Sequence, residues 1–258
     1  MANTVFYPEL IAAGVEQKLG DSIKLYPLLK KENLEGKVGG DKLRVFKNTY
    51  IGDATVVVAG QPIPITDFSD ATELVDVNKY GKAVTFTEEE IISGVNVQER
   101  AETQLTKSVA AGIENALFAE LKAITGAMNH AAVETELSTG VISSALVKMG
   151  EDVDSEMYLF VNPAELGNLR KDVNFVEKLD GRLNAIGSIY GANVVVSNRV
   201  GAKEAFLIRP DAIAVALKKD IQVEVQKEVS DQTYIIAGTA HAAVYVADDS
   251  GVVKITLA

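Results

Sequence analysis

The chain contains two histidines, His130 and His241, and an imidazole is the side chain best suited to exchange a proton near neutral pH. His130 lies in a loop of small residues, and His241 lies inside a predicted strand. Nucleophilic catalysis needs a nucleophile beside the base and an acid that orients the base, and neither histidine shows such a spacing. We interpret both as surface or packed histidines, and the sequence indicates no catalytic residue.

Acidic pairs offer a second kind of chemistry, the binding of a divalent cation. Asp152 and Asp154 are close enough to share an ion, but calcium needs six or more oxygen ligands from a shaped loop, and no such loop follows them. The run DDSG at 248–251 has the composition of a turn. The chain has no cysteine, which removes thiolate catalysis, disulfides and Cys-ligated metals. The sequence therefore predicts no metal site.

A glycine-rich loop that cradles a phosphate would be a third kind of site. The segment GSIYG at 187–191 lacks the Gly-Lys-Ser/Thr ending of such a loop, and no Gly-x-Gly-x-x-Gly follows a predicted strand. We therefore expect no nucleotide and no other cofactor.

The net charge and the hydropathy of the chain exclude some classes of binding partner. The net charge of −11 argues against a general phosphate-binding surface, since nonspecific nucleic-acid affinity rests on clustered Lys and Arg. No apolar run approaches the ~20 residues of a membrane span, and the N-terminus lacks a basic patch followed by an apolar stretch. A chain of 258 residues with 47% hydrophobic content can bury a sizeable core. The sequence predicts a protein without a membrane partner, made and used without export.

The strongest structural signal is a long helix within residues 87–125. Thr87 and Glu90 have the spacing of a capping box, Gly94 interrupts the run, and a second start signal follows at 96–99. About 25 residues without proline then predict a rod near 40 Å long. The half at 97–107 is amphipathic, whereas the half at 109–124 is apolar nearly all round. We expect the second half to pack under strands of its own subunit, and the first half to lie nearer the hairpin described next.

Two segments before the rod are predicted to extend away from the core. Residues 8–20 read as a short helix followed by an extended arm that reaches Asp41. Predicted strands at 43–50 and 74–86 flank an excursion whose Pro62 and Pro64 exclude a central position in a sheet. An isolated ribbon of this kind is marginal in water, so a partner should fix it. The apolar residues expected to contact neighbouring subunits are Leu10, Ile11 and Val15 in the arm and Val56, Val57, Ile63 and Ile65 in the excursion.

The rest of the chain predicts an α/β region and then an antiparallel sheet. A helix at 139–150 precedes the apolar strand at 157–161, and Asn162-Pro163-Ala164-Glu165 opens another helix. After a strand at 193–196, the chain turns mostly β, with alternating segments around 221–229 and 234–247 and a last strand at 252–257.

This order of elements resembles the major capsid protein of tailed bacteriophages. The segments that carry the resemblance are KAVTFTEE (82–89), YLFVNP (158–163) and GSIYGANVVVSN (187–198), and the similarity in order spans nearly the whole chain. It implies an α+β fold with an N-terminal arm, an extended β-hairpin loop, a peripheral domain with a long spine helix, and an inserted axial α/β domain. The implied boundaries are 1–41 for the arm, 42–86 for the extended loop, 87–125 and 201–258 for the peripheral domain, and 126–200 for the axial domain.

The resemblance implies a structural function rather than an enzymatic one. The protein would be made in the host cytoplasm and assemble as pentamers and hexamers into the icosahedral head shell of a virion. Portal and scaffolding proteins would be partners, and the shell would enclose packaged DNA with little specific binding. Some members of the family join neighbouring subunits through a Lys in the extended loop and an Asn on another subunit. Residues 52–78 contain no lysine, so we predict no cross-link at the tip of the loop.

Two other functions are compatible with the sequence. An encapsulin-like nanocompartment shell would have the same fold and enclose cargo enzymes instead of DNA. A soluble α/β binding or hydrolase-like domain would need a cleft that holds a perturbed acid or histidine.

Overall fold

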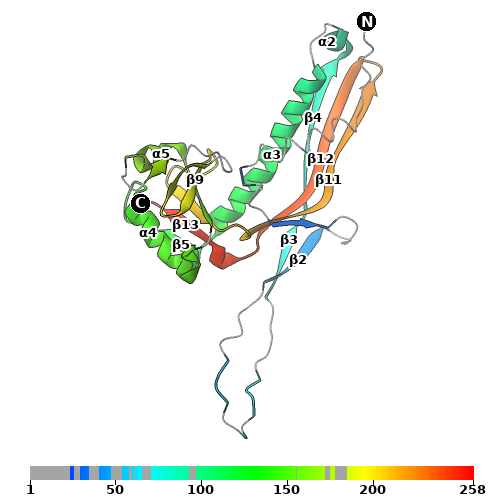
Figure 1. The fold of residues 1–258 in the computed structure, drawn as a ribbon. Helices are drawn as coiled ribbons and strands as arrows, with labels where there is room; N and C mark the ends of the chain where they lie inside the picture. Colours follow the sequence, from blue (N-terminus) through cyan, green and yellow to red (C-terminus); the bar gives the residue numbers. More distant parts are fainter. Residues whose placement is uncertain are drawn as a thin grey trace.

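The described residues form two β-sheets, a two-stranded ribbon and a few helices, a fold of mixed α+β type (Figure 1). The computed structural model describes residues 24–25, 30–34, 41–47, 54–57, 60, 62–65, 71–92, 97–154, 156–171, 175–177 and 185–258. The described strands are β1 (Lys30–Asn33), β2 (Lys42–Lys47), β3 (Ala71–Asp76), β4 (Asn78–Thr87), β5 (Asn129–Ala131), β6 (Met157–Val161), β7 (Val176–Glu177), β8 (Ala185–Ile189), β9 (Ala192–Val196), β10 (Glu204–Ile208), β11 (Ile213–Glu228), β12 (Thr233–Val246) and β13 (Val252–Thr256). The described helices are α2 (Glu88–Ile92), α3 (Val97–Ala123), α4 (Thr139–Leu146) and α5 (Pro163–Leu169), with 3-10 turns η2 (Gly126–Met128), η3 (Val147–Asp154) and η5 (Asp249–Gly251).

Helix α3 lies along a four-stranded sheet with the order β1-β11-β12-β4 (Figure 1). Strands β11 and β12 form a long antiparallel pair, and β4 continues the sheet beside β12. The helix has 27 residues, which gives a length of about 40 Å. The rod predicted from the sequence is therefore confirmed.

The burial of α3 follows the two halves expected from its sequence. In the second half, apolar side chains join the largest core cluster together with strands β11 and β12; these are Val109, Ile113, Leu117, Phe118 and Leu121. Among the described side chains of the first half, Ala101 and Leu105 are buried against Phe86 and Ile236, whereas Gln104 and Lys107 are exposed. One end of the helix is thus enclosed and the other packs by a single face.

The start of the helical region has the predicted capping box. The Thr87 N–H donates to Oε2 of Glu90 at 3.0 Å, and the Glu90 N–H donates to Oγ1 of Thr87 at 3.3 Å. This box ends β4 and begins α2.

The prediction that the amphipathic half of α3 lies nearer the hairpin excursion is wrong. That half lies at the end of the sheet away from the hairpin excursion (Figure 1). The reason is the length of β4, whose ten residues carry the chain about 30 Å from the ribbon before the helix begins.

The second sheet has seven strands in the order β5-β13-β10-β6-β9-β8-β7. Its core contains the fully buried strand β6 and the apolar face of α4. Strand β6 runs parallel to β9, and α5 follows β6 with Asn162 as the predicted N-cap, whose side chain accepts from the Ala164 N–H at 3.0 Å. A tight turn at Tyr190 and Gly191, both with positive φ, joins β8 to β9.

The strands of residues 201–258 do not all lie in the four-stranded sheet that packs against α3. Strands β11 and β12 lie in the four-stranded sheet, whereas β10 and β13 belong to the seven-stranded sheet. The boundary that places all of 201–258 in the peripheral domain therefore does not follow the sheets. The cause is local, because β10 pairs with both β6 and β13 and so continues the second sheet.

Candidate subunit-contact surfaces

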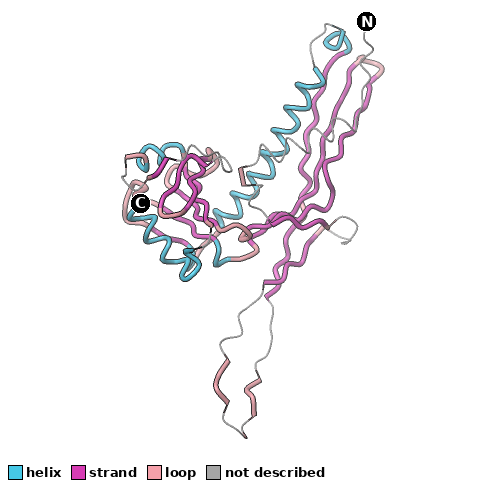
Figure 2. The backbone as a smooth tube through the Cα atoms, viewed as in Figure 1, coloured by secondary structure: helices cyan, strands magenta, loops and turns pink. Residues whose placement is uncertain are grey.

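The ribbon of β2 and β3 carries a long excursion away from both sheets, and Figure 2 shows the described loop pieces beyond its end. Within these pieces the predicted contact residues are exposed, with 98% of Val56, 37% of Val57, 77% of Ile63 and 95% of Ile65 open to solvent. Four apolar side chains on a proline-containing loop are costly to leave in water. The structure thus brings together on one excursion all the candidates predicted there.

The ribbon itself has two faces of different character. Leu43, Val45 and Val75 point inward and pack with a small cluster at the end of the four-stranded sheet. Phe46 and Leu74 lie on the outer face and are about 60% and 59% exposed. These two residues were missed from the sequence, although the alternation of β2 and β3 contains the signal, because a ribbon that packs by one face must expose every second side chain.

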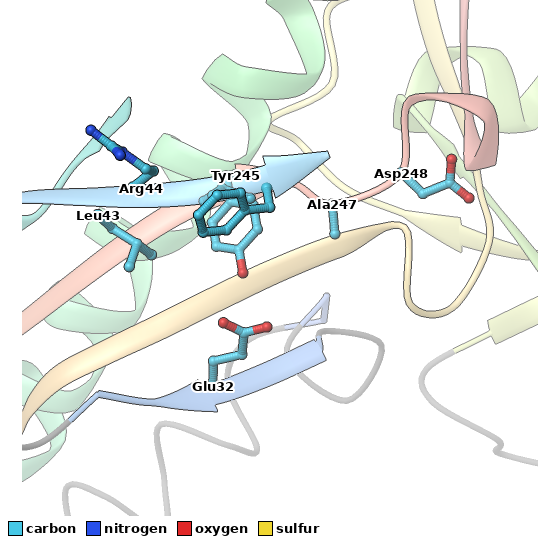
Figure 3. Close-up of a pocket in the computed structure, with 8 residues that line it drawn as sticks. Glu32, Leu43, Arg44, Tyr245, Ala247 and Asp248 are labelled. Atoms are coloured by element: carbon cyan, nitrogen blue, oxygen red, sulfur yellow. The ribbon is translucent and has the colours of Figure 1, made fainter. Parts of the chain in front are cut away.

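An open cavity of about 570 Å³ lies under the ribbon (Figure 3). Glu32 and Tyr245 face each other in it, and the phenol of Tyr245 is hydrogen-bonded to the Glu32 carboxylate. Burial raises the pKa of Tyr245 above its usual range, and the nearby Glu32 charge adds to this effect. The Tyr245 phenol therefore stays protonated, and its hydrogen bond to Glu32 links β12 to β1. This gives the cavity a structural role.

Residues 24–25, 30–34 and 41 of the arm are described, and Lys24 and Leu25 contact the body of the subunit. Leu25 is fully buried in the main core, and Lys24 Nζ donates to the Val196 carbonyl at 2.5 Å. The predicted contact residues Leu10, Ile11 and Val15 lie outside the described residues.

The residues considered for chemistry are placed apart. His130 lies on β5 opposite Ile255 in the seven-stranded sheet, whereas His241 lies on β12 opposite Lys79 in the four-stranded sheet. Asp248 forms the predicted turn, since its side chain accepts from the Ser250 N–H at 2.9 Å. The side chains of Asp152 and Asp154 lie outside the described part of the chain. Among the described residues, no three His, Asp or Glu side chains are grouped as metal ligands would be.

A family model described as phage capsid protein matches residues 70–255, well over half of the chain. The chain belongs to the phage capsid protein family. The match covers the second strand of the ribbon, the spine helix α3 and almost all of both sheets.

Relatives of this capsid protein agree with the assignment. The major capsid protein of Staphylococcus phage phiMR11 is 28% identical over 257 residues, which cover 96% of this chain and 92% of that protein. The capsid of the cyanophage P-SCSP1u has the same fold with a TM-score of 0.70 at 11% identity, over 90% of this chain and 86% of the other. The virus-like particle of Pyrococcus furiosus matches with a TM-score of 0.67 at 13% identity, over 97% and 100% of the two chains.

These findings establish a major capsid protein that forms the shell of a phage head and is part of the virion. They favour the phage head over the two other functions compatible with the sequence, since the family and the curated relative are both phage capsid proteins. The likeness to the Pyrococcus particle shows a shared fold.

In the described part of the chain, no helix combines the length and apolar character needed to cross a membrane.

Proposed function

We propose that subunits of this capsid protein hold one another through the excursion and the arm. The observation that supports the proposal is the exposure of Val56, Ile63 and Ile65 on a loop that packs against nothing described in its own subunit. Burial of one such side chain contributes roughly 1.5–3 kcal/mol, so three or four of them suffice for a specific contact repeated around a ring. Leu10, Ile11 and Val15 would add to this contact from the arm.

The parts of the subunit would then have separate tasks. The four-stranded sheet with α3 would form the peripheral domain, and the seven-stranded sheet would form the axial domain, around which pentamers and hexamers close. Residues 1–41 would serve as the arm and 42–86 as the extended loop with part of the peripheral sheet. Portal and scaffolding proteins would assist assembly.

The enclosed DNA would meet a surface that does not bind it tightly. A net charge of −11 repels the phosphate backbone, so packaged DNA stays mobile inside the shell. The protein would act by assembly alone, without catalysis, a metal or a cofactor.

A pair of substitutions at the tip tests the proposed contact. The variant Ile63→Asp/Ile65→Asp should remain folded, because both side chains are exposed in the subunit, but it should not form closed shells. The matched control Ile63→Val/Ile65→Val keeps the apolar surface and should assemble. Electron microscopy and sedimentation give the readout. Closed shells from the aspartate variant would contradict the proposal.

A further inference from the structure

Three segments that are distant in the sequence meet at Glu114, in the enclosed half of α3. Only 3% of Glu114 is exposed. Its Oε2 accepts an ion pair from Arg199 Nη1 at 2.7 Å, and its carboxylate accepts a hydrogen bond from the backbone N–H of Lys24. Arg199 follows β9 of the seven-stranded sheet, and Lys24 belongs to the arm. One carboxylate therefore connects the spine helix, the second sheet and the arm.

Each partner of Glu114 is held by a further contact. Arg199 Nε donates to Oδ1 of Asn115 at 2.8 Å, which fixes the guanidinium on α3 in two places. Lys24 Nζ donates to the Val196 carbonyl at 2.5 Å and so ties the arm to the end of β9. The turn that carries Arg199 is itself fixed, since Nδ2 of Asn162 donates to the Val200 carbonyl at 2.7 Å. The contacts form a continuous network with directional bonds at every step.

The burial of the Glu114 carboxylate in this network lowers the free energy of unfolding. Burial raises the pKa of Glu114, and the nearby charges of Arg199 and Lys24 only partly oppose that effect. Oε1 of Glu114 is buried and accepts no hydrogen bond from the described residues. A buried ion pair of this kind is often matched or exceeded in stability by apolar side chains of similar volume. Stability alone does not account for a carboxylate at this position.

We propose that Glu114 is a positioning residue that fixes the spine helix, the seven-stranded sheet and the arm in one relative arrangement, so that shells close with a uniform size. Hydrogen bonds, including the charge-assisted bond of an Arg–Glu pair, are directional, whereas apolar contacts tolerate sliding and rotation. In a shell, a small change in the angle between the two sheets is repeated at every subunit contact, and closure depends on that rotation. The inference rests on shell formation and is independent of the proposed contacts of the excursion.

The double variant Glu114→Met/Arg199→Met tests this role, because it removes both charges and keeps side-chain volume. Its unfolding midpoint should equal or exceed that of the wild type. Amide exchange at Lys24 and Leu25 should become roughly tenfold faster, and electron micrographs should show a wider distribution of shell diameters. The control Glu120→Met replaces a carboxylate at an exposed site of the same helix and should leave shell diameter unchanged.

Two results would overturn the proposal. One is a double variant with wild-type exchange and uniform shells of wild-type diameter. The other is a clear fall in the unfolding midpoint, which would make Glu114 an ordinary structural residue. The milder variant Lys24→Met removes the bond to Val196 and the Lys24 charge near Glu114 but keeps the ion pair with Arg199. It should also broaden the diameters, and uniform shells from it would count against the proposal. Excursion variants, in contrast, should stop assembly without changing exchange at Lys24 and Leu25.

Discussion

The ring of Phe86 stacks on the ring of Tyr234, with centroids 5.6 Å apart and ring planes inclined by 12°. The two residues are direct partners across β4 and β12. Lys227 Nζ lies 4.9 Å from the centroid of the Tyr234 ring and 3.2 Å from Oε2 of Glu88, so β11 and α2 join the same cluster. This cluster fixes the end of the four-stranded sheet where the helical region begins.

Replacement of Phe86 by alanine should destabilise the subunit by roughly 3–5 kcal/mol, because the ring is buried between the sheet and Leu105 of α3. Denaturant unfolding of the unassembled subunit measures the change. The matched control Phe46→Ala removes a ring that is 60% exposed on the ribbon and should cost far less. Equal losses in the two variants would show that Phe86 does not support the far end of the sheet.

The capping box at Thr87 should contribute about 1 kcal/mol, because it satisfies two backbone N–H groups at the start of α2. The variant Thr87→Ala should lose this amount, and Thr87→Ser, which keeps the hydroxyl, should retain most of it. Unfolding midpoints and amide exchange at Glu90 provide the measurements. Unchanged exchange at Glu90 in the alanine variant would contradict the expectation.

Local signals explain why much of the fold could be predicted. The box at Thr87, the N-cap at Asn162 and the turn at Asp248 each depend on contacts within three residues, and all three were expected from sequence. The burial of the second half of α3 follows equally from its apolar composition. Features of this kind need no knowledge of distant parts of the chain.

Features that depend on tertiary pairing could not be predicted in the same way. Strands β10 and β13 flank β11 and β12 in the sequence, yet the two pairs lie in different sheets. The position of the amphipathic half of α3 depends on the direction in which β4 runs, which sequence periodicity does not specify. The ion pair of Glu114 joins residues 85 positions apart, and no local pattern indicates it.

Glu114 should also make the stability of the subunit depend on pH. Burial raises the pKa of its carboxyl above the ordinary value of 4.5, so the folded state binds this proton more tightly than the unfolded state does. As the pH falls from neutral through the raised pKa toward 4.5, the contribution of Glu114 to the free energy of unfolding should become more favourable. Denaturant titrations of wild type and Glu114→Gln at several pH values measure this difference, which should grow on acidification. An opposite slope would show that the ion pair with Arg199 outweighs the effect of burial.

The outer face of the ribbon is a second candidate surface for contacts between subunits. It lies closer to the two sheets than the tip of the excursion does. Arg44 lies directly opposite Leu74, and Phe46 follows on the same face. Because Phe46 and Leu74 are mostly exposed, the variant Phe46→Ser/Leu74→Ser should unfold within about 0.5 kcal/mol of the wild type. Its yield of closed shells should nevertheless fall, as measured by sedimentation. The control Val45→Ser alters the inner face and should lower stability instead.

Assembled shells should dissociate completely into single subunits in a denaturing gel. Residues 52–78 contain no lysine, so the excursion offers no amine for a covalent link to a neighbour. Lys47 lies in the β2 ladder opposite Ala71, and the exposed Lys79 and Lys82 lie in the β4 ladder opposite His241 and Gly238. All three lie toward the base of the excursion rather than at its tip. The expected result is one band at 27.6 kDa from particles of any age. A ladder of multimers would contradict the prediction, and mass spectrometry of the linked peptides would then identify the lysine that reacts.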